Sequence, residues 1–398
     1  MLPSLPGSRW AETVRLSHNR ARIQCHPIMS KSAACVSRAG DGEQLCTLLH
    51  YASFEELPAE VLALWERVGT VRPFLSLDWF RNLHTNVGAD LGELFIYVLF
   101  AGTGRPLCIL PCGRRTDTRH GDVKLLALAN YYSTCYDILV DEGSGDRGQV
   151  IAQFMGALAR QSGWDSLTLF PVRHGSELEH LQAAARTNML AVSSFFETAN
   201  WSETITDLEQ YRACRSSQMR STLKRRTARM VRDTQHRYEV VTELTEVPRA
   251  VADFDRCYAA SWKVPEPYPH FIEGLASIAA KRGWLRLGLL YINDQPAAGQ
   301  LWLVNSGVAS IYKLAYDAQF QEYSPGTLLT MHLLEHVVRQ DQVTHVDFLT
   351  GDDGYKRDWM STRDELWRLR ICNLRRWRGV VTAGYDRLRK WQYKLRGE

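Results

Sequence analysis

Residues 346–359 (VDFLTGDDGYKRDW) bring together the residue types that acid–base chemistry uses. Asp347 lies on a strand-like apolar run beside a polar turn bounded by glycines, where a carboxylate can act as a general base. Tyr355 can donate a proton, and Lys356 can bind a phosphate or carboxylate group. A solvated, charged turn between two strands would have the same composition. These residues alone therefore leave both interpretations open.

A second stretch, residues 321–329 (QEYSPGTLL), is typical of the start of a helix. Ser324 is a suitable N-cap, Pro325 suits the first helical position, and Gly326 lets a ligand approach the backbone. The unpaired N–H groups and the positive end of the helix dipole would together make an anion site. An ordinary capped helix explains the same residues without a ligand.

Two segments are strongly basic. Residues 212–237 contain nine Lys and Arg and one acidic residue, with Met219, Leu223 and Met230 near one helical face. They predict either a solvated amphipathic helix or a helix that binds a phosphorylated substrate or RNA. The tail after residue 368 interleaves Arg and Lys with Trp and Tyr. It predicts a packed terminal helix or an interfacial helix that touches acidic lipid.

The usual catalytic motifs do not occur in the sequence. It has no P-loop, nucleophile elbow, zinc-protease motif or dinucleotide-binding glycine motif after a strand. His332 and His336 are spaced like metal ligands on a helix but have no third ligand nearby, so we expect no metal. The nine cysteines form no C-x-x-C pair, which favours reduced thiols in the cytoplasm. The net charge of +4 is too small to indicate nucleic acid by itself.

The composition, 45% hydrophobic and 23% charged over 398 residues, is that of a globular protein with a real core. Internal similarity divides the chain into two halves. Residues 132–140 and 312–320 share a Y-x-x-x-Y-D pattern, and each is followed by an amphipathic helix and a strand. Each half also begins with a helix and a hairpin; the helices are 73–84 and 269–282, and the strands 93–100, 107–113, 285–292 and 297–304. The pattern predicts an α/β or α+β fold of two related domains, with mixed sheets flanked by helices.

We divide the chain at three points. Residues 1–44, rich in Ser, Arg and Ala, are predicted to be a disordered leader. Residues 45–200 and 201–375 form the two related domains, and residues 376–398 form a basic C-terminal helix. The second domain alone carries the S-P-G turn and the D-D-G-Y-K-R-D-W cluster. It is therefore the better candidate for an active site.

Five stretches of the second half resemble, in order and spacing, the BioF2-like (CelD-type) acetyltransferase domain of the GNAT superfamily. They are the basic helix before residue 237, S-W-K at 261–263, Y-K-L-A-Y-D at 312–317, E-Y-S-P-G-T-L-L at 322–329, and residues 347–359. The first half resembles the degenerate GNAT-like domain that precedes it in such proteins. The resemblance implies tandem GNAT-like acyl-CoA N-acyltransferase folds, similar to those of Fem-type aminoacyltransferases.

The resemblance also implies an activity, the transfer of an acyl group, usually acetyl, from acyl-CoA to an amine or hydroxyl. The acceptor would attack the thioester directly, with Asp347 as base or acceptor anchor, Tyr355 as proton donor to the thiolate and Lys356 as anion contact. Acetyl-CoA or another acyl-CoA would bind through its pyrophosphate to the turn formed by Tyr323, Ser324, Pro325, Gly326 and Thr327. This turn departs from the usual Q/R-x-x-G-x-G/A loop. The acceptor cleft would be lined by Trp262, Lys263, Tyr316 and Asp317.

The acceptor is expected to be a small molecule or a glycan precursor, in polysaccharide or cell-envelope metabolism. We expect no nucleic-acid partner, and peripheral membrane contact through the basic C-terminal helix. Two alternatives remain. A Fem-like enzyme would take its acyl group from aminoacyl-tRNA, although the sequence lacks the long heptad helix that Fem-type ligases often use for tRNA. A binding protein would keep the fold without catalysis.

Overall fold

The computed structural model of the protein describes residues 35–37 and 46–396, all of which belong to one compact unit. Most of the predicted leader, residues 1–44, lies outside the described residues. The short stretch Cys35–Ser37 inside it forms an edge strand, β1, that pairs antiparallel with β2 (Cys46–Tyr51).

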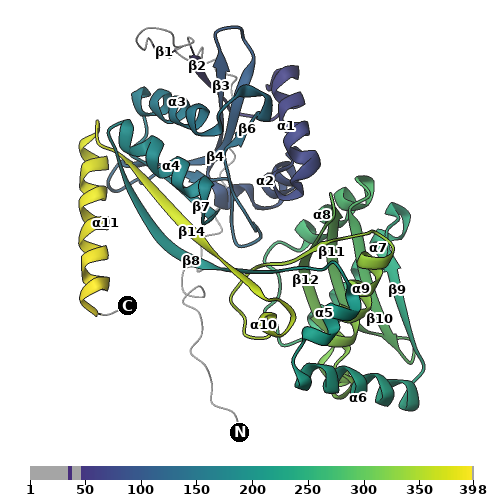
Figure 1. The fold of residues 1–398 in the computed structure, drawn as a ribbon. Helices are drawn as coiled ribbons and strands as arrows, with labels where there is room; N and C mark the ends of the chain where they lie inside the picture. The colour runs from purple at the N-terminus through teal and green to yellow at the C-terminus, as the bar shows by residue number, and fades with distance from the viewer. Residues whose placement is uncertain (1–34, 38–45, 397–398) are drawn as a thin grey trace. The chain divides into compact units, whose positions relative to one another are not determined.

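The described strands form one mixed sheet (Figure 1). Its order is β1-β2-β3-β4-β5-β7-β14-β8-β13-β12-β11-β10-β9, and β6 pairs with β4 off this path. The remaining strands are β3 (Glu93–Ala101), β4 (Pro106–Thr116), β5 (Val123–Ala127), β6 (Leu139–Val140), β7 (Ser166–Arg173), β8 (Leu190–Thr204), β9 (His236–Val241), β10 (Leu285–Ile292), β11 (Gln295–Asn305), β12 (Val308–Tyr316), β13 (His345–Thr350) and β14 (Thr362–Asn373).

Helices flank this sheet on both sides (Figure 1). They are α1 (Ala59–Val71), α2 (Leu77–Leu91), α3 (Arg147–Arg160), α4 (Ser176–Thr187), α5 (Leu208–Cys214), α6 (Ser217–Asp233), α7 (Val247–Ala259), α8 (Pro269–Lys281), α9 (Pro325–Arg339), α10 (Lys356–Trp359) and α11 (Trp377–Arg396). Short 3₁₀ turns are η1 (Pro73–Leu75), η2 (Glu142–Ser144), η3 (Leu244–Glu246) and η4 (Ala318–Tyr323). Across the described part of the chain, no helix combines the length and the hydropathy that crossing a bilayer requires.

The two halves share one connectivity, which confirms the predicted fold class of two related α/β units. In the first half, the hairpin β3-β4 leads to β5, then to α3, then to β7, which lies parallel to β5. In the second half, the hairpin β10-β11 leads to β12, then to α9, then to β13, which lies parallel to β12.

The pattern shared by 132–140 and 312–320 favours a strand in both halves, but at 132–140 only Leu139–Val140 forms one, paired with β4. Before Leu139, nearby side chains accept the hydrogen bonds of two backbone N–H groups. The Tyr132 N–H donates to Asn130 Oδ1 (2.9 Å), and the Asn130 N–H donates to Ser133 Oγ (3.2 Å). Side-chain bonds of this kind compete with strand pairing. The counterpart of β12 is β5, so the Y-x-x-x-Y-D repeat does not mark equivalent strands.

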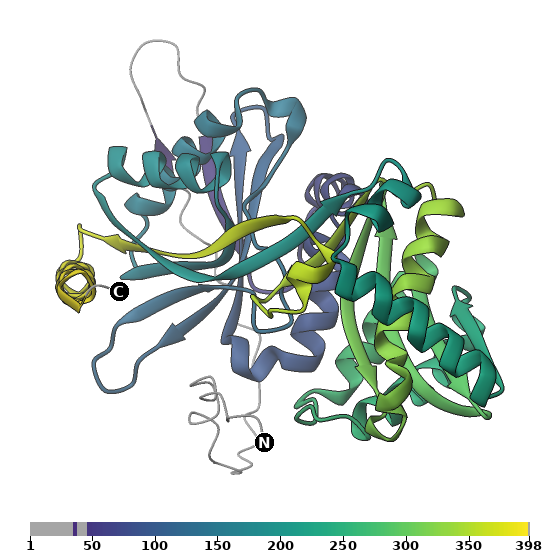
Figure 2. The same ribbon diagram turned by 60° about the horizontal axis from the view of Figure 1, so that its bottom comes forward.

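Two long strands exchange places between the halves. β8 follows the first half in sequence but pairs with β13, whereas β14 follows the second half but pairs with β7. The two strands also pair with each other along their length, from Leu190 with Asn373 to Ser202 with Thr362 (Figure 2). The predicted boundary between 200 and 201 therefore falls inside β8, and the division into domains at that point stays a prediction.

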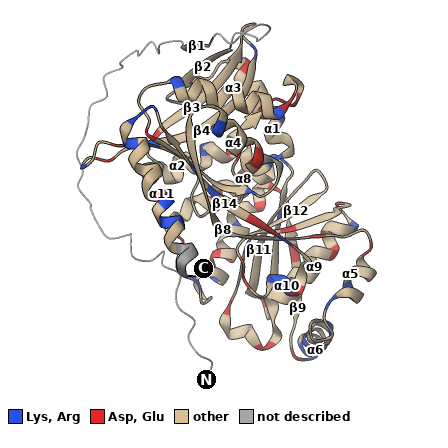
Figure 3. Ribbon diagram, turned by 60° about the vertical axis from the view of Figure 1, so that its left-hand side comes forward, with Lys and Arg blue, Asp and Glu red and all other residues tan. Residues whose placement is uncertain are grey.

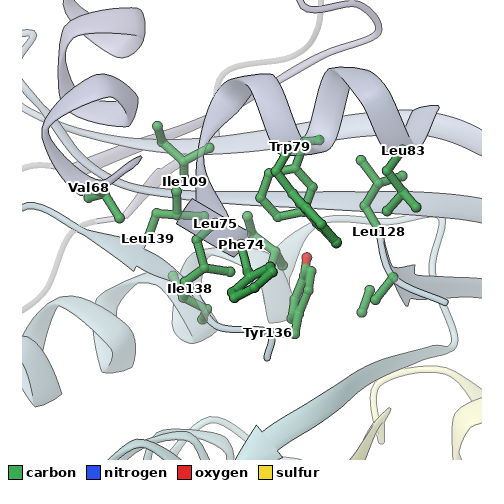
Figure 4. Packing of buried hydrophobic residues seen from close by; sticks show 14 of the residues in the cluster. Val68, Phe74, Leu75, Trp79, Leu83, Ile109, Leu128, Tyr136, Ile138 and Leu139 are labelled. Atoms are coloured by element: carbon green, nitrogen blue, oxygen red, sulfur yellow. The ribbon is translucent and has the colours of Figure 1, made fainter. Parts of the chain in front are cut away.

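Aromatic residues continue the core from one half into the other. In the first half, Phe74, Trp79 and Tyr136 pack together beside η1 and α2 (Figure 4). The Trp79 ring lies 5.4 Å from Phe271 of α8, and Tyr132 stacks on Phe271 at 4.1 Å between ring centroids. Because this shared core and the exchanged strands join the halves, side chains from both can meet in one fixed site.

Replacing Phe271 tests this shared core. The side chain is fully buried between Trp79 and Tyr132, so Phe271→Ala should cost about 3–5 kcal/mol of unfolding free energy. Val264→Ala, at a residue that is 82% exposed, is the control and should change it by less than about 0.5 kcal/mol. Urea unfolding of the wild type should show a single transition, and two separate transitions would contradict a common core.

Candidate active site

The parallel strands β12 and β13 separate after three residue pairs. They pair at Val308 with His345, Ala309 with Val346 and Ser310 with Asp347, and no further. Both strands are irregular where they part. The pairing of β12 with β11 shifts register between Trp302, which faces Ile311, and Leu301, which faces Lys313. The pairing of β13 with β8 shifts register between Asp347 and Thr350. Beyond this point, each strand presents backbone N–H and C=O groups that the other does not pair.

A cavity of about 220 Å³ lies in this opening between β12 and β13. Its walls come from Ile311 to Leu314 of β12 and from Phe348 to Thr350 of β13. Residues of the first half, Tyr131, Tyr132 and Thr134, close it, and its polar lining is completed by Lys263, Asp353, Tyr355 and Lys356. The structure thus places two of the predicted catalytic residues, Tyr355 and Lys356, and one predicted acceptor residue, Lys263, on one cavity.

Lys356 is buried, with 4% of its surface exposed, and it donates hydrogen bonds to the carbonyl groups at the end of β13 that has left β12. Its Nζ donates to the carbonyl oxygens of Phe348 (3.1 Å), Leu349 (3.3 Å) and Thr350 (2.7 Å). The ammonium group therefore supplies hydrogen bonds in the segment that has left β12. Burial lowers the pKa of Lys356 to about 8, although nearby carboxylates, Asp353 first among them, oppose this.

Lys263 performs the same task on β12. Its half-buried Nζ donates to the carbonyl oxygen of Leu314 (2.5 Å). Burial and the neighbouring positive charge of Lys313 lower the pKa of Lys263 to about 8, against the opposing effect of Glu266. Each of the two separated strands thus has a lysine that donates to its backbone carbonyl oxygen atoms. Burial lowers the pKa of both lysines to about 8.

Glu266 is the centre of a polar cluster beside the cavity. Its carboxylate accepts hydrogen bonds from the hydroxyls of Tyr131 (2.8 Å), Tyr132 (2.7 Å) and Tyr258 (2.8 Å), and from Lys313 Nζ (2.6 Å). Burial alone would raise the pKa of Glu266, but the charge of Lys313 and the hydrogen bonds together hold it below its usual value. The cluster links both halves at the cavity.

Tyr355 and Asp353 are the groups of the 346–359 stretch that face the cavity with exposed polar surface. The Tyr355 ring packs edge-on against Phe348 at 5.8 Å and is 44% exposed. Burial, with the charge of Asp353, raises the pKa of Tyr355, so the phenol keeps its proton at neutral pH. A Cβ added to Gly351 would lie 3.0 Å from both Asp353 Oδ2 and Lys356 Nζ, so these two groups converge there.

Asp347 lies outside the cavity lining and is 4% exposed. Its Oδ1 accepts hydrogen bonds from Asn200 Nδ2 (2.8 Å) and the Leu349 N–H (2.7 Å), and its Oδ2 pairs with Arg173 (2.9 Å). Leu349 has a left-handed backbone (φ 57°), which is costly for a residue other than glycine. These contacts make Asp347 a support for the bend in β13.

The predicted anion turn is the start of α9. Pro325 is the first helical residue as predicted, and Ser324 occupies the N-cap position with a left-handed backbone (φ 54°). The prediction that the Ser324 side chain caps the helix is wrong, because it accepts no hydrogen bond from the first turn. In that conformation its hydroxyl is not directed at the N–H groups, which leaves the helix start without a side-chain cap.

Tyr316 and Trp262 connect this turn with the cavity. A Cβ on Gly326 would lie 3.3 Å from the Tyr316 ring, and the Trp262 ring is 4.8 Å from that of Tyr316. Trp262 precedes Lys263 in the chain, so the contacts run from the helix start to the cavity wall. Asp317 does not join them: its carboxylate accepts from the Gln319 N–H (2.9 Å) and caps η4.

The predicted basic helix is divided into α5 and α6 at Ser216, whose hydroxyl accepts from the Met219 N–H (3.1 Å). α6 packs against η4 at the start of α9. Arg226 donates to the Glu322 carbonyl, and Arg229 pairs with the Glu322 carboxylate and stacks on Tyr323 at 5.5 Å. Two cationic groups thus lie beside the turn that was predicted to bind an anion.

Several polar groups of the cavity were not predicted from the sequence, among them Tyr131, Tyr132, Lys313 and Asp353, together with Glu266 behind them. Asp353 lies in the stretch 346–359 and Lys313 in the stretch 312–317, both of which the sequence indicates as functional. The motifs therefore point to the right segments, although they do not point to these two residues. The tyrosines come from the other half of the chain, about 130 residues from Glu266. Tyr132 begins the Y-x-x-x-Y-D stretch at 132–140, but no local spacing indicates that either tyrosine contacts Glu266.

His332 stacks on Tyr238 at 4.2 Å between ring centroids, and burial lowers the pKa of His332 and of His336. Within the described ranges, neither belongs to a group of possible ligands close enough to hold one ion; Asp117, His120 and Asp122 form such a group elsewhere. The expectation of no metal stays a prediction.

Comparison with known proteins agrees with this geometry. A family model described as an acetyltransferase (GNAT) domain matches residues 217–357, which run from α6 to the first residues of α10 and include both separated strands. No curated protein matches the sequence.

Several solved structures are similar to this chain. FemX shares 9% identity over 80% of this chain and 97% of its own, with a TM-score of 0.56. The C-terminal domain of a putative lysylphosphatidylglycerol synthetase from Agrobacterium fabrum shares 14% over 82% of this chain and 96% of its own (TM-score 0.49). A tandem GNAT protein from the clavulanic acid biosynthesis pathway shares 14% over 81% and 98% (TM-score 0.45).

The fold and the cavity define the class: two α/β halves of the same connectivity, with the opening between parallel strands in the second half, inside the residues that match a GNAT domain. Residues 217–357 match the model of an acetyltransferase (GNAT) domain, and the comparisons go no further than that. Identities this low indicate the fold alone, and membership of the CelD-type family stays a prediction.

The lowered pKa of Lys356 gives a test in solution. Between pH 8 and its usual pKa of 10.5, the unfolded chain holds a proton that the folded chain has lost, so stability rises with pH in this window. Raising the pH from 8 to 9.5 should therefore stabilise the wild type relative to Lys356→Met, by at most about 1.4 kcal/mol per pH unit.

Urea unfolding at pH 7, 8 and 9.5 measures this difference. Lys224→Met, on the exposed face of α6, is the control and should follow the wild type at each pH. Equal slopes for the wild type and Lys356→Met would show that Lys356 titrates normally.

Proposed function

We propose that this chain is an acyltransferase that moves an acyl group, in the first instance acetyl, from acyl-CoA to an amine or hydroxyl of a small-molecule or glycan-precursor acceptor. The observation that carries the proposal is the opening between β12 and β13, with its polar cavity, inside the residues that match a GNAT acetyltransferase domain. Its place would be the cytoplasm, in polysaccharide or cell-envelope metabolism.

The residues present fit an acyl-CoA donor. An extended arm containing amides can hydrogen-bond to the backbone groups that β12 and β13 no longer share, as an added strand would. Within the predicted Tyr323–Thr327 turn, a pyrophosphate would meet the N–H groups of Gly326 and Thr327 at the start of the 15-residue helix α9, since Pro325 has no N–H and that of Ser324 donates to Gln321. Arg226 and Arg229, which now bind Glu322, are close enough to this turn to add charge-assisted contacts.

The chemistry would be direct transfer. The acceptor atom forms a bond to the acyl carbon while the carbon–sulfur bond breaks, the acceptor loses one proton and the leaving thiolate gains one. Tyr355 is suited to supply the second proton, because it lies on the cavity and its phenol is protonated at neutral pH. The positive charges of Lys263 and Lys356 would stabilise negative charge that develops on the thioester oxygen.

For the proton of the acceptor, we propose Asp353 as the base. Its carboxylate is exposed and lines the cavity, whereas Asp347, the residue favoured by sequence, is buried and already accepts three contacts. Asp347 would then act as a positioning residue that holds the bend of β13 and, through it, the carbonyls that bind Lys356. The acceptor would lie against Trp262, Lys263 and the Glu266 cluster.

A second donor, aminoacyl-tRNA, is favoured by one observation, the array of cations on α6. Arg220, Lys224 and Arg225 are exposed on this helix, which reaches the start of α9 through Arg226 and Arg229. Such a helix can hold phosphate groups of RNA as well as those of CoA.

Ligand-dependent stabilisation distinguishes these donors. A ligand at about 100 times its dissociation constant should stabilise the protein by roughly 2.7 kcal/mol. We expect acetyl-CoA to raise the melting temperature and an Arg226→Ala/Arg229→Ala double variant to lose most of that rise. An increase with aminoacyl-tRNA alone would support the second donor, and no increase with either would support a binding protein that has lost catalysis.

Single variants of Asp353, Tyr355 and Asp347 distinguish proton transfer from structural support. Asp353→Asn and Tyr355→Phe should each lower kcat by about 10²-fold while leaving the melting temperature unchanged, as expected for proton-transfer groups. Asp347→Asn should lose on the order of 2–3 kcal/mol of stability, because it removes the charge of a buried carboxylate that pairs with Arg173. Full activity in Asp353→Asn, with a stable but inactive Asp347→Asn, would return the role of base to Asp347.

A further inference from the structure

The helix α11 is docked on the sheet by one narrow face. Gly379 is packed so closely that an added Cβ would lie 2.1 Å from the Asn373 carbonyl oxygen. Four and seven residues further on, Ala383 and Asp386 are also buried, and Asp386 pairs with Arg370 of β14 (2.7 Å). In Figure 2, α11 is seen almost along its axis, and the strands lie on one side of it.

The opposite face of α11 is apolar and exposed. The side chains that share this face are 49% to 75% exposed; they are Trp377, Val380, Val381, Tyr385, Leu388 and Trp391. Their spacing of three and four residues places them on one continuous stripe, which we call the α11 stripe. A contiguous apolar stripe of this length on the surface indicates a surface for interaction.

Basic residues border the stripe on both sides. At 100° per residue, Arg387 lies beside Val380 and Trp391, whereas Arg378 and Arg389 lie on the other edge beside Tyr385. The helix contains six Lys and Arg and a single acidic residue, Asp386, which is buried and paired. Figure 3 shows this concentration of positive charge along α11.

A basic cavity adjoins the helix. It has a volume of about 270 Å³ and lies between the end of α4, the start of β8 and α11. Its polar lining is positive, from Arg186, Arg387 and Lys390, and its floor is formed by Leu190 to Ser193 and Ala383. A cavity of this size and charge suits a phosphate-bearing headgroup.

We propose that α11 lies in the interface of an anionic lipid bilayer. The α11 stripe would enter the acyl-chain boundary, the flanking Arg residues would contact headgroup phosphates, and the basic cavity would take one headgroup. Apolar burial supplies part of the binding in such helices, and each nearby Lys or Arg adds to it on an anionic surface. Trp at both ends of the stripe suits the boundary between headgroups and acyl chains.

The charge pattern favours lipid over a second copy of this chain. A two-fold contact of one α11 stripe with another would bring the basic edges of both helices together, with no acidic residue on α11 to compensate. An anionic surface satisfies both the apolar stripe and its edges. This inference is independent of the proposed acyl transfer.

Cosedimentation of the full-length protein with vesicles tests the proposal. Binding to vesicles of phosphatidylcholine with about one-third phosphatidylglycerol should be at least tenfold stronger than binding to phosphatidylcholine alone, and should weaken as NaCl rises from about 0.05 to 0.5 M. The triple variant Trp377→Ser/Leu388→Ser/Trp391→Ser should bind at least tenfold more weakly. Arg387→Gln should weaken binding to the anionic vesicles and leave any binding to neutral vesicles unchanged.

A matched triple variant, Val71→Ser/Val231→Ser/Leu244→Ser, removes exposed apolar residues elsewhere and should bind like the wild type. Thermal unfolding is the check that both triple variants are folded. Equal vesicle binding by the α11 variant and the wild type would overturn the proposal. So would a dimer in light scattering that the α11 variant converts to a monomer, because a second copy would then cover the stripe.

Discussion

The opening between β12 and β13 depends on one buried carboxylate. Asp347 is the last residue of β13 that pairs with β12, and its Oδ1 accepts from the N–H of Leu349, the residue whose left-handed backbone turns the strand away. Left-handed leucine is unfavourable unless surrounding contacts impose it. Asn200 and Arg173 hold the same carboxylate from two other strands, so the bend is imposed from three directions. The bend directs β13 away from β12, and the cavity lies in the opening that results.

Separating two strands in a protein interior exposes backbone groups that need partners. Here the carbonyls are satisfied by Lys356 on β13 and by Lys263 on β12, and that requirement explains why two ammonium groups are buried at one cavity. Their burial lowers both pKa values to about 8. The same feature that stabilises the opening thus places two lysine side chains on the lining of the cavity. Because both lysines hold the separated strands, variants of either residue need a stability measurement beside the activity.

The sequence predicts the parts of this protein that depend on local pattern. The hairpins, the helices α3 and α9 and the strands after them follow from periodicity, and the start of α9 at Pro325 follows from helix-start chemistry. The strand exchange of β8 and β14 is different, because residues such as Leu190 and Asn373 are far apart in sequence and nothing local specifies their pairing. The Glu266 cluster was missed for the same reason. Asp347 was chosen from its place on a strand end, but burial, which decides whether a carboxylate can reach a substrate, depends on Asn200 and Arg173 from elsewhere in the fold.

A basic amphipathic helix at the end of the chain is also readable from the sequence, but its role depends on which face the fold covers. Had Trp377, Leu388 and Trp391 packed on β14, α11 would be an ordinary terminal helix with a charged exterior. Instead, the narrow face formed by Gly379, Ala383 and Asp386 packs, because a glycine and an alanine allow the closest approach to the strand carbonyls. The ion pair of Asp386 with Arg370 fixes the rotation of the helix about its axis. Two small residues and one buried carboxylate therefore determine that the aromatic and basic residues face outward.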